Sequence, residues 1–164
     1  TLEDFVGWAR RTASRSDAQF WTVIDLATGM PAGVAAYLRI APLAGSIEVG
    51  HVHYSPRLRR TPTATEAMFL MMLRVFTLGY RRYEWKCNAL NAPSRNAALR
   101  YGFTYEGIFR QHIIAKGRNR DNAWFSILDS EWPALKAAFE RWLEPSNFDA
   151  QGRQRKRLEE TRSP

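Results

Sequence analysis

The sequence contains a single cysteine, Cys87, among its 164 residues. One thiol cannot form an internal disulfide, and it cannot build a zinc site that needs several cysteines. No apolar run approaches the roughly 20 residues that a membrane-spanning helix needs, and the opening residues do not resemble a signal peptide. We therefore expect a cytoplasmic protein with no disulfide, no metal centre and no membrane partner.

Acidic residues are the minority charge. The chain has 24 lysines and arginines against 16 aspartates and glutamates, which gives a formal net charge of +8. Five basic and two acidic residues fall between positions 151 and 164, so about +5 remains on the rest. Such a charge favours a phosphate-bearing partner, but it does not distinguish a small molecule from a nucleic acid.

The length suits one domain with a substantial core, and no internal repeat is visible. After position 144 the composition turns polar and charged. We expect a folded domain over 1–144 and an extended or disordered charged tail over 145–164. The chain opens on Thr1 rather than on methionine, which suggests a fragment of a longer protein.

Hydrophobic periodicity and turn residues predict a mixed order of helices and strands. Helices are expected over 2–12, 62–78, 91–101 and from a cap at Asp129 or Ser130 to about 143. Strands are expected over 20–26, 32–40, 46–54, 83–88, 105–115 and 122–128. The strand–helix–strand unit from 46 to 88 predicts a parallel crossover between flanking hairpins. The fold class is therefore mixed α/β, not a doubly wound parallel sheet.

Three arginines, Arg57, Arg59 and Arg60, lie directly before the helix expected at 62. The positive end of the helix dipole disfavours cations there, so an anion bound between them is one reason for their position. First-turn amides would point into the same loop, which predicts a phosphate or pyrophosphate site. A solvated charged loop before a core helix is the alternative.

This helix has two possible caps. Thr61 can cap it, with Pro62 at the first helical position. Alternatively, Thr63 caps it and Glu66 closes a capping box. The sequence does not decide between them.

Three stretches carry a resemblance to a known family: IEVGHVHYSPRLRRTPTATEAMFLMM, NAPSRNAALRYGFTYEGIFRQ and GRNRDNAWFSILDSEW. Together they resemble the GNAT superfamily of acyl-CoA N-acyltransferases, and most closely the RimJ/RimL type of ribosomal-protein N-terminal acetyltransferases. The resemblance covers about 20 to 143 and implies a GNAT-type mixed sheet with a central strand–helix–strand unit that binds acetyl-CoA. It implies acetyl transfer to a primary amine, either a protein N-terminus or a small molecule. The family's opening strand and helix would lie upstream of the first residue.

The resemblance also implies which residues hold acetyl-CoA. The family's pyrophosphate pattern, Arg/Gln-x-x-Gly-x-Gly/Ala, runs here from Arg59 to Ala64, with Pro62 at the middle glycine. Because proline has no N–H, one phosphate donor is lost, and we expect Arg60 and the capped threonines to compensate. The implied cofactor-binding set is Val52, Tyr54, Arg59, Arg60, Thr61, Thr63, Ala64, Thr65, Asn88 and Asn91.

Acetyl transfer from a thioester to an amine needs a neutral amine, a donor for the oxyanion and a proton for the leaving thiolate. No covalent intermediate is required, so Cys87 is expected to be a buried strand residue. The tyrosine that many GNAT enzymes use as the acid corresponds to Ala98. Ser94, where RimL-like enzymes keep a serine, is therefore the acid candidate, and a helix residue bonded to backbone is its alternative.

The candidates for the general base on the strand expected over 46–54 are Glu48, His51 and His53. The glutamate that RimL-like enzymes use corresponds to Ile113, and His112 beside it is expected to point to the opposite face of its strand. Glu48 is the first candidate and His53 the second, because a carboxylate or an imidazole can accept the amine proton. Strand alternation predicts that these two lie on opposite faces of their strand. A water chain can replace either.

Two other functions stay open. Pro62, Ala98 and Ile113 depart from the family's catalytic-type positions, as a CoA-binding module without activity would. The net charge suits a nucleic-acid-binding domain, but the arginines gather at one helix start and no aromatic–basic pattern follows a face. Arg118 and Arg120 on the last hairpin either contact an acidic acceptor or are solvated. An exposed edge strand would favour a homodimer.

Overall fold

A six-stranded sheet organises the chain in the computed structural model, which describes residues 1–14 and 17–162. The strands are β1 (Ala18–Asp25), β2 (Met30–Ala41), β3 (Ser46–Tyr54), β4 (Arg82–Asn88), β5 (Thr104–Ala115) and β6 (Arg118–Leu128). Their order in the sheet is β1-β2-β3-β4-β6-β5. The β3–β4 pair is parallel, whereas β1–β2, β2–β3, β4–β6 and β5–β6 are antiparallel. The predicted mixed sheet with one parallel crossover is therefore confirmed.

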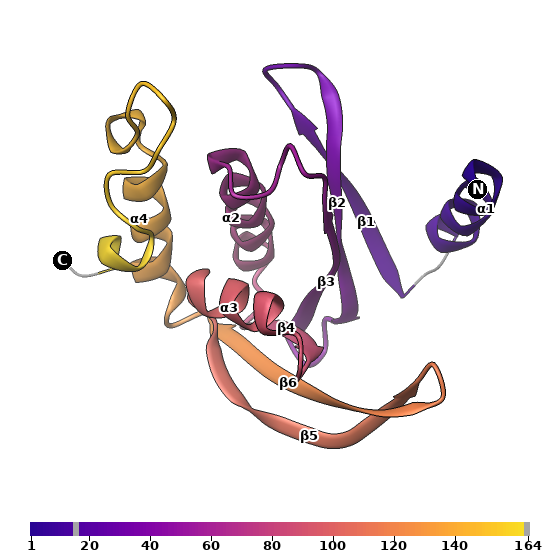
Figure 1. Cartoon of the computed structure of the whole chain (residues 1–164). Helices are drawn as coiled ribbons and strands as arrows, with labels where there is room; N and C mark the ends of the chain where they lie inside the picture. Colours follow the sequence, from indigo (N-terminus) through magenta and orange to yellow (C-terminus); the bar gives the residue numbers. More distant parts are fainter. Residues whose placement is uncertain (15–16, 163–164) are drawn as a thin grey trace.

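The helices divide between the two sides of the sheet. In the part of the chain that the structure describes they are α1 (Leu2–Ala13), α2 (Pro62–Thr77), α3 (Ala92–Arg100) and α4 (Trp132–Leu143). Figure 1 shows α2, α3 and α4 on one side, while α1 lies apart from them, beyond β1. No helix among these described residues is long and apolar enough to cross a membrane.

The core lies between α2, α3, α4 and one face of the sheet. Ile47 of β3 and Tyr83 of β4 are buried there with Met68 of α2. Because side chains alternate along a strand, Glu48 and Lys86 lie on the opposite face. We refer to this face, away from α2, α3 and α4, as the far face. Cys87 is buried in the core, as expected.

Most element boundaries lie within one or two residues of the prediction, and two differences have a specific physical cause. The strand expected from 122 begins at Arg118, because the hairpin turn consists only of Lys116 and Gly117, both with positive φ. Helix α4 begins after Glu131 rather than after a cap at Asp129 or Ser130, and no side-chain cap bond is formed. The Glu131 carboxylate instead accepts the Leu128 N–H at 2.8 Å.

The segment that follows α4 is ordered through 162, so the expectation of an extended or disordered tail is wrong there. It contains two short 3₁₀ turns, Pro145–Asn147 and Glu159–Thr161. Leu158 is fully buried in the main core, and the Thr161 hydroxyl donates to the Ala138 carbonyl at 3.0 Å. The composition of the segment did not indicate these few buried residues, because its average polarity is set mainly by the exposed charged residues.

Replacing Leu158 with alanine tests how much this segment stabilises the fold. A buried leucine truncated to alanine leaves a cavity, so the free energy of unfolding should fall by about 2–5 kcal/mol. The matched control is Leu90→Ala, because Leu90 is 90% exposed and should change stability by less than about 0.5 kcal/mol. Urea denaturation measures both, and equal midpoints for the two variants would contradict the packing.

Candidate active site

The strands β3 and β4 separate along their length. They are paired in parallel over 46–49 and 82–85, whereas 50–54 and 86–88 are not paired with each other. Within β3, His51 has φ +48, and the register against β2 slips there, so that two residues oppose one. Such a bulge bends a strand and increases its local twist. The result is a split in the sheet between the carboxyl-terminal ends of β3 and β4.

The same bulge changes which β3 side chains face the core. Before it, Val49 is buried in the core, and after it Val52 and Tyr54 pack against buried clusters. His53 therefore lies on the far face with Glu48. The prediction that these two lie on opposite faces is wrong, because one extra residue shifts the alternation by one position.

Glu48 is a nearly buried carboxylate on the far face, with 2% of its surface exposed. The Nε of Arg39 donates to its Oε2 at 2.6 Å, and Lys86 Nζ lies 4.0 Å from the same oxygen. Burial raises the pKa of Glu48 above its usual value, although Arg39 and Lys86 act in the opposite direction. A carboxylate with a raised pKa is suited to accept a proton.

Ser94 lies in the first turn of α3, directly after the end of β4. The Asn91 side chain caps this helix by accepting the Ser94 N–H at 3.2 Å, as the sequence indicated. The Trp85 indole donates to the Ser94 hydroxyl at 3.1 Å. Because this bond uses only a lone pair of the oxygen, the hydroxyl hydrogen remains available for donation.

Thr61 caps α2, and Pro62 occupies its first position. The Thr61 hydroxyl accepts the Ala64 N–H at 3.2 Å and donates to the Leu58 carbonyl at 2.7 Å. The first of the two predicted caps is therefore the one formed. Since Pro62 has no N–H and that of Ala64 is used, Thr63 supplies the remaining first-turn amide toward the loop.

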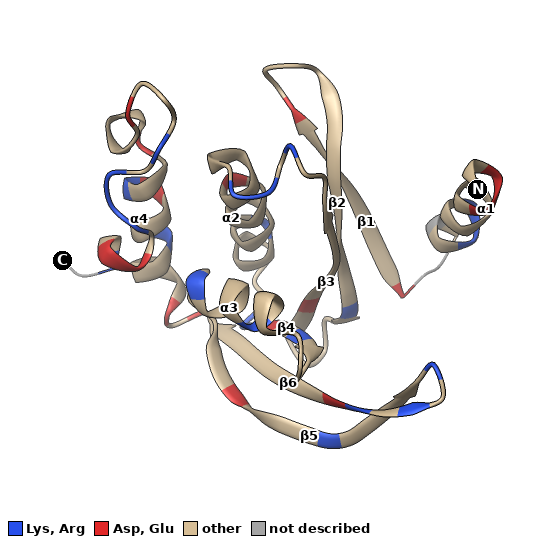
Figure 2. Cartoon of the chain, in the orientation of Figure 1, with Lys and Arg blue, Asp and Glu red and all other residues tan. Residues whose placement is uncertain are grey.

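Figure 2 shows basic residues along the loop that enters α2. Arg59 Nε donates to the Tyr54 carbonyl at 2.9 Å, which holds its side chain against the end of β3. Arg60 has φ +62, a conformation that favours glycine. Arg100 of α3 also reaches this helix start, where its Nη1 donates to the Thr65 hydroxyl at 3.1 Å. No sequence motif pointed to Arg100, because only the fold brings α3 beside the start of α2.

Three other predicted cofactor-binding residues lie near the carboxyl-terminal ends of β3 and β4, on either side of the split. Val52 and Tyr54 are near the end of β3, and Asn88 is the last residue of β4. The Asn88 side chain accepts the Leu90 N–H at 2.9 Å, which shapes the turn into α3.

A further group of polar side chains lies on the far face, and of its members the sequence had indicated only Arg120 as a possible acceptor contact. Asn122 is fully buried, its Nδ2 lies 2.6 Å from His112 Nδ1, and its Oδ1 accepts Arg120 Nε at 2.9 Å. Burial, followed by the charges of Lys86, Arg39 and Arg120, lowers the pKa of His112. Only the tertiary pairing of β5 with β6 brings these groups together.

His112 reaches this group through a bulge in β5. Residues 110–112 of β5 lie opposite Asp121 alone, and Gln111 within them has φ +48. The Gln111 N–H donates to Asp121 Oδ1 at 2.7 Å. Arg120 and Asn122 are two residues apart on β6, so their side chains share one face. Ile113 lies on this face because it is paired with Arg120. His112 also lies on it, because its ring contacts Asn122. The expected alternation of His112 and Ile113 therefore does not hold.

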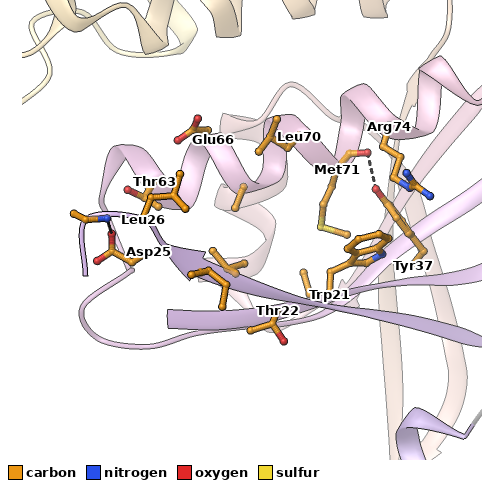
Figure 3. Close-up of a pocket in the computed structure, with 15 residues that line it drawn as sticks. Trp21, Thr22, Asp25, Leu26, Tyr37, Thr63, Glu66, Leu70, Met71 and Arg74 are labelled. Carbon is orange, nitrogen blue, oxygen red and sulfur yellow. Dashed lines mark hydrogen bonds between the residues drawn. The ribbon is translucent and has the colours of Figure 1, made fainter. Parts of the chain in front are cut away.

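A separate apolar pocket of about 540 Å³ lies between β1 and α2. Figure 3 shows Trp21, Leu70 and Met71 among its lining residues, with the Tyr37 hydroxyl donating to the Met71 carbonyl at 2.9 Å. None of the candidate catalytic residues lines it. Within 1–14 and 17–162, no group of three histidine, cysteine or acidic residues could hold a metal ion.

Comparisons with known proteins identify the family of this chain. The model of the acetyltransferase (GNAT) domain family matches residues 1–104. A GCN5-related N-acetyltransferase from Brucella melitensis is 54% identical, with 100% of this chain and 75% of that chain covered and a TM-score of 0.97. A probable acetyltransferase of the GNAT family from Chromobacterium violaceum is 44% identical, with 81% and 67% covered and a TM-score of 0.78.

A proposed ribosomal-protein-serine acetyltransferase from Vibrio cholerae is 24% identical over 77% of this chain and 72% of that chain, with a TM-score of 0.64, and shares the fold. Comparison with curated proteins finds no match. The family match spans the split strand pair, the arginine loop and α3, and the first two structures extend the likeness beyond the fold to the sequence. This chain belongs to the GNAT family of acetyltransferases.

Proposed function

We propose that the chain moves the acetyl group of acetyl-CoA to a primary amine by direct attack within a ternary complex. The observation that carries the proposal is the split between β3 and β4. Glu48 lies beside it on the far face, and Ser94 lies beyond it at the start of α3. A proton acceptor and a proton donor thus flank the place where the strands part.

In this reaction a C–N bond forms as the C–S bond breaks. Glu48 takes the proton that the attacking amine loses, and Ser94 gives a proton to the departing thiolate. Exchange with solvent returns both residues to their starting states. His53, which is exposed on the same face, is the second candidate for the base. Burial and the anchoring bond from Arg39 favour Glu48.

Acetyl-CoA supplies the activated acyl group, and its phosphates bind at the arginine-containing loop before α2. Arg59, Arg60 and the Thr63 amide bind the phosphates, while Thr61, Ala64 and Thr65 form the helix start that presents them. The backbone of Val52 and Tyr54, together with Asn88 and Asn91, holds the pantetheine arm. Two observations support this arrangement. Arg60 has a positive φ, and the Arg59 guanidinium is held against the end of β3 by its bond to the Tyr54 carbonyl.

The acceptor is a protein N-terminus or a small-molecule amine, and the stretch NAPSRNAALRYGF supports a place near the RimJ/RimL branch. A cytoplasmic location stays a prediction. A homodimer also stays a prediction: β1 and β5 are the edges of the described sheet, and an edge strand can pair with a second copy. Sedimentation would measure the oligomeric state.

Acetyl-CoA should raise the melting temperature, and an amine panel should release free thiol from it. The panel needs neutral, anionic and cationic amines, as small molecules and as peptides. Binding without thiol release from any amine would favour a CoA-binding module without activity. Stabilisation by duplex RNA or DNA and not by acetyl-CoA would favour the nucleic-acid alternative.

Replacing Glu48 with glutamine should lower kcat/KM by about 10²–10⁴-fold, the range of a lost general base. In the native chain the base is active when deprotonated, so activity should rise with pH through the raised pKa of Glu48. In the Glu48→Gln variant, activity should not show this rise with pH. Glu140→Gln is the matched control, because Glu140 is exposed on α4 and pairs with Lys136, away from the far face. An unchanged profile in Glu48→Gln, together with loss of activity in His53→Gln, would move the role to His53.

The double replacement Arg59→Ala with Arg60→Ala tests the phosphate site. The Kd for acetyl-CoA should rise by about 10–100-fold, because charge-assisted bonds to phosphate are lost. The Kd for acetyl-pantetheine, which has no phosphate, should not change. Calorimetry measures both, with Arg155→Ala on the exposed C-terminal segment as the control. Equal losses for the two ligands would remove the phosphate role.

A further inference from the structure

Three cations lie on the far face, and two of them, Arg39 and Lys86, approach Glu48. We refer to Arg39 of β2, Lys86 of β4 and Arg120 of β6 as the basic cluster. Lys86 is paired across the strands with Trp124 of β6, and its ammonium lies 5.0 Å from that ring centroid. Burial lowers the pKa of Lys86 most, Glu48 raises it, and the charges of Arg39 and Arg120 lower it further, so both arginines lie within electrostatic reach of Lys86.

The nearby carboxylates do not balance the basic cluster. Glu48 is bound by Arg39 and is the carboxylate that Lys86 approaches, at 4.0 Å. Glu84 and Glu106 both bind Arg82, each at 2.7 Å. With Arg82 included, four cations on this face meet three carboxylates. Among the residues that the structure describes, no ion pair joins Arg120 to a carboxylate. The cluster therefore holds more positive than negative charge beside the candidate base.

The side chains of Lys86 and Arg120 in the basic cluster are held in place by neighbouring residues of the sheet. Arg120 donates to Asn122, a side chain with no exposed surface that also contacts His112. The Lys86 side chain is only 14% exposed and lies over Trp124. By contrast Arg118, at the hairpin turn, is exposed. Fixed cations cost less entropy to bind an anion than mobile ones do.

We propose that the basic cluster selects acceptors that carry an anionic group next to the reacting amine. The proposal rests on the proposed function, because it takes the far face beside Glu48 as the side from which the amine enters. An anion held by Lys86 and Arg120 brings a neighbouring amine toward Glu48, the carboxylate nearest Lys86. Surplus positive charge also lowers the pKa of a bound amine, which favours its neutral, nucleophilic form. Polycationic amines are repelled by the same charge.

The anionic group has two sources. In a free amino acid it is the α-carboxylate, and in a peptide it is an acidic side chain at the N-terminus. Two matched pairs of ligands separate them: alanine against alaninamide, and Asp-Ala-Ala-amide against Asn-Ala-Ala-amide. Lys-Ala-Ala-amide is the cationic comparison.

Calorimetry at pH 7 in the presence of CoA measures the Kd of each ligand without requiring turnover. The anionic member of at least one pair should bind about tenfold more tightly than its neutral partner, as expected of a charge-assisted contact. A preference within the first pair points to free amino acids, and one within the second to acidic N-termini. Equal Kd values within both pairs, or tightest binding of the lysine peptide, would overturn the proposal.

Variants then assign any preference to the basic cluster. Lys86→Met and Arg120→Gln should each reduce it at least threefold. Lys136→Met is the matched control, because Lys136 of α4 pairs with Glu140 at 2.9 Å, away from the far face. A preference that both cluster variants retain would also overturn the proposal. Selective binding without thiol release from acetyl-CoA would instead contradict the proposed function and leave the anion site standing.

Discussion

The site depends on a repeated break in strand alternation. Arg39 of β2, His51 of β3 and Gln111 of β5 are non-glycine residues with positive φ, and each lies where the strand register slips. Such conformations cost of order 1–3 kcal/mol each and persist only where the surroundings enforce them. Each break moves a functional group to the far face: the Arg39 guanidinium, His53 and His112. A regular sheet with the same sequence would divide these groups between its two faces.

The split and the bulges serve one arrangement. Separation of β3 from β4 removes the interstrand hydrogen bonds beyond 49 and 85, so backbone groups there remain for a ligand. Val52 of the separated part of β3 packs against the core, and Trp85, the last paired residue of β4, is buried in it. Trp85 also contacts Ser94, so the acid candidate is fixed by the same packing that fixes the strands. Stability and reactivity therefore share side chains.

Much of the fold could be predicted from the sequence because it follows from periodicity and caps. The strand at 46–54 and the helix start at Pro62 coincide with prediction. The pairing of Arg39 with Glu48 and of Asn122 with His112 could not be predicted, because strand register and bulges join them. The buried Leu158 was missed for another reason: one apolar anchor carries little weight among charged neighbours.

The buried amide of Asn122 has a chemical consequence for His112. With Nδ2 facing the ring and Oδ1 occupied by Arg120, the amide donates to Nδ1 of the imidazole. The neutral ring must then carry its hydrogen on Nε2, so this edge presents a donor. His112 in this tautomer can hold an acceptor atom of a substrate, but it has no free lone pair to take an amine proton. One fixed carboxamide thus removes His112 from the possible proton acceptors, so the candidate bases stay Glu48 and His53, and it leaves the Nε2–H of His112 able to donate to a substrate.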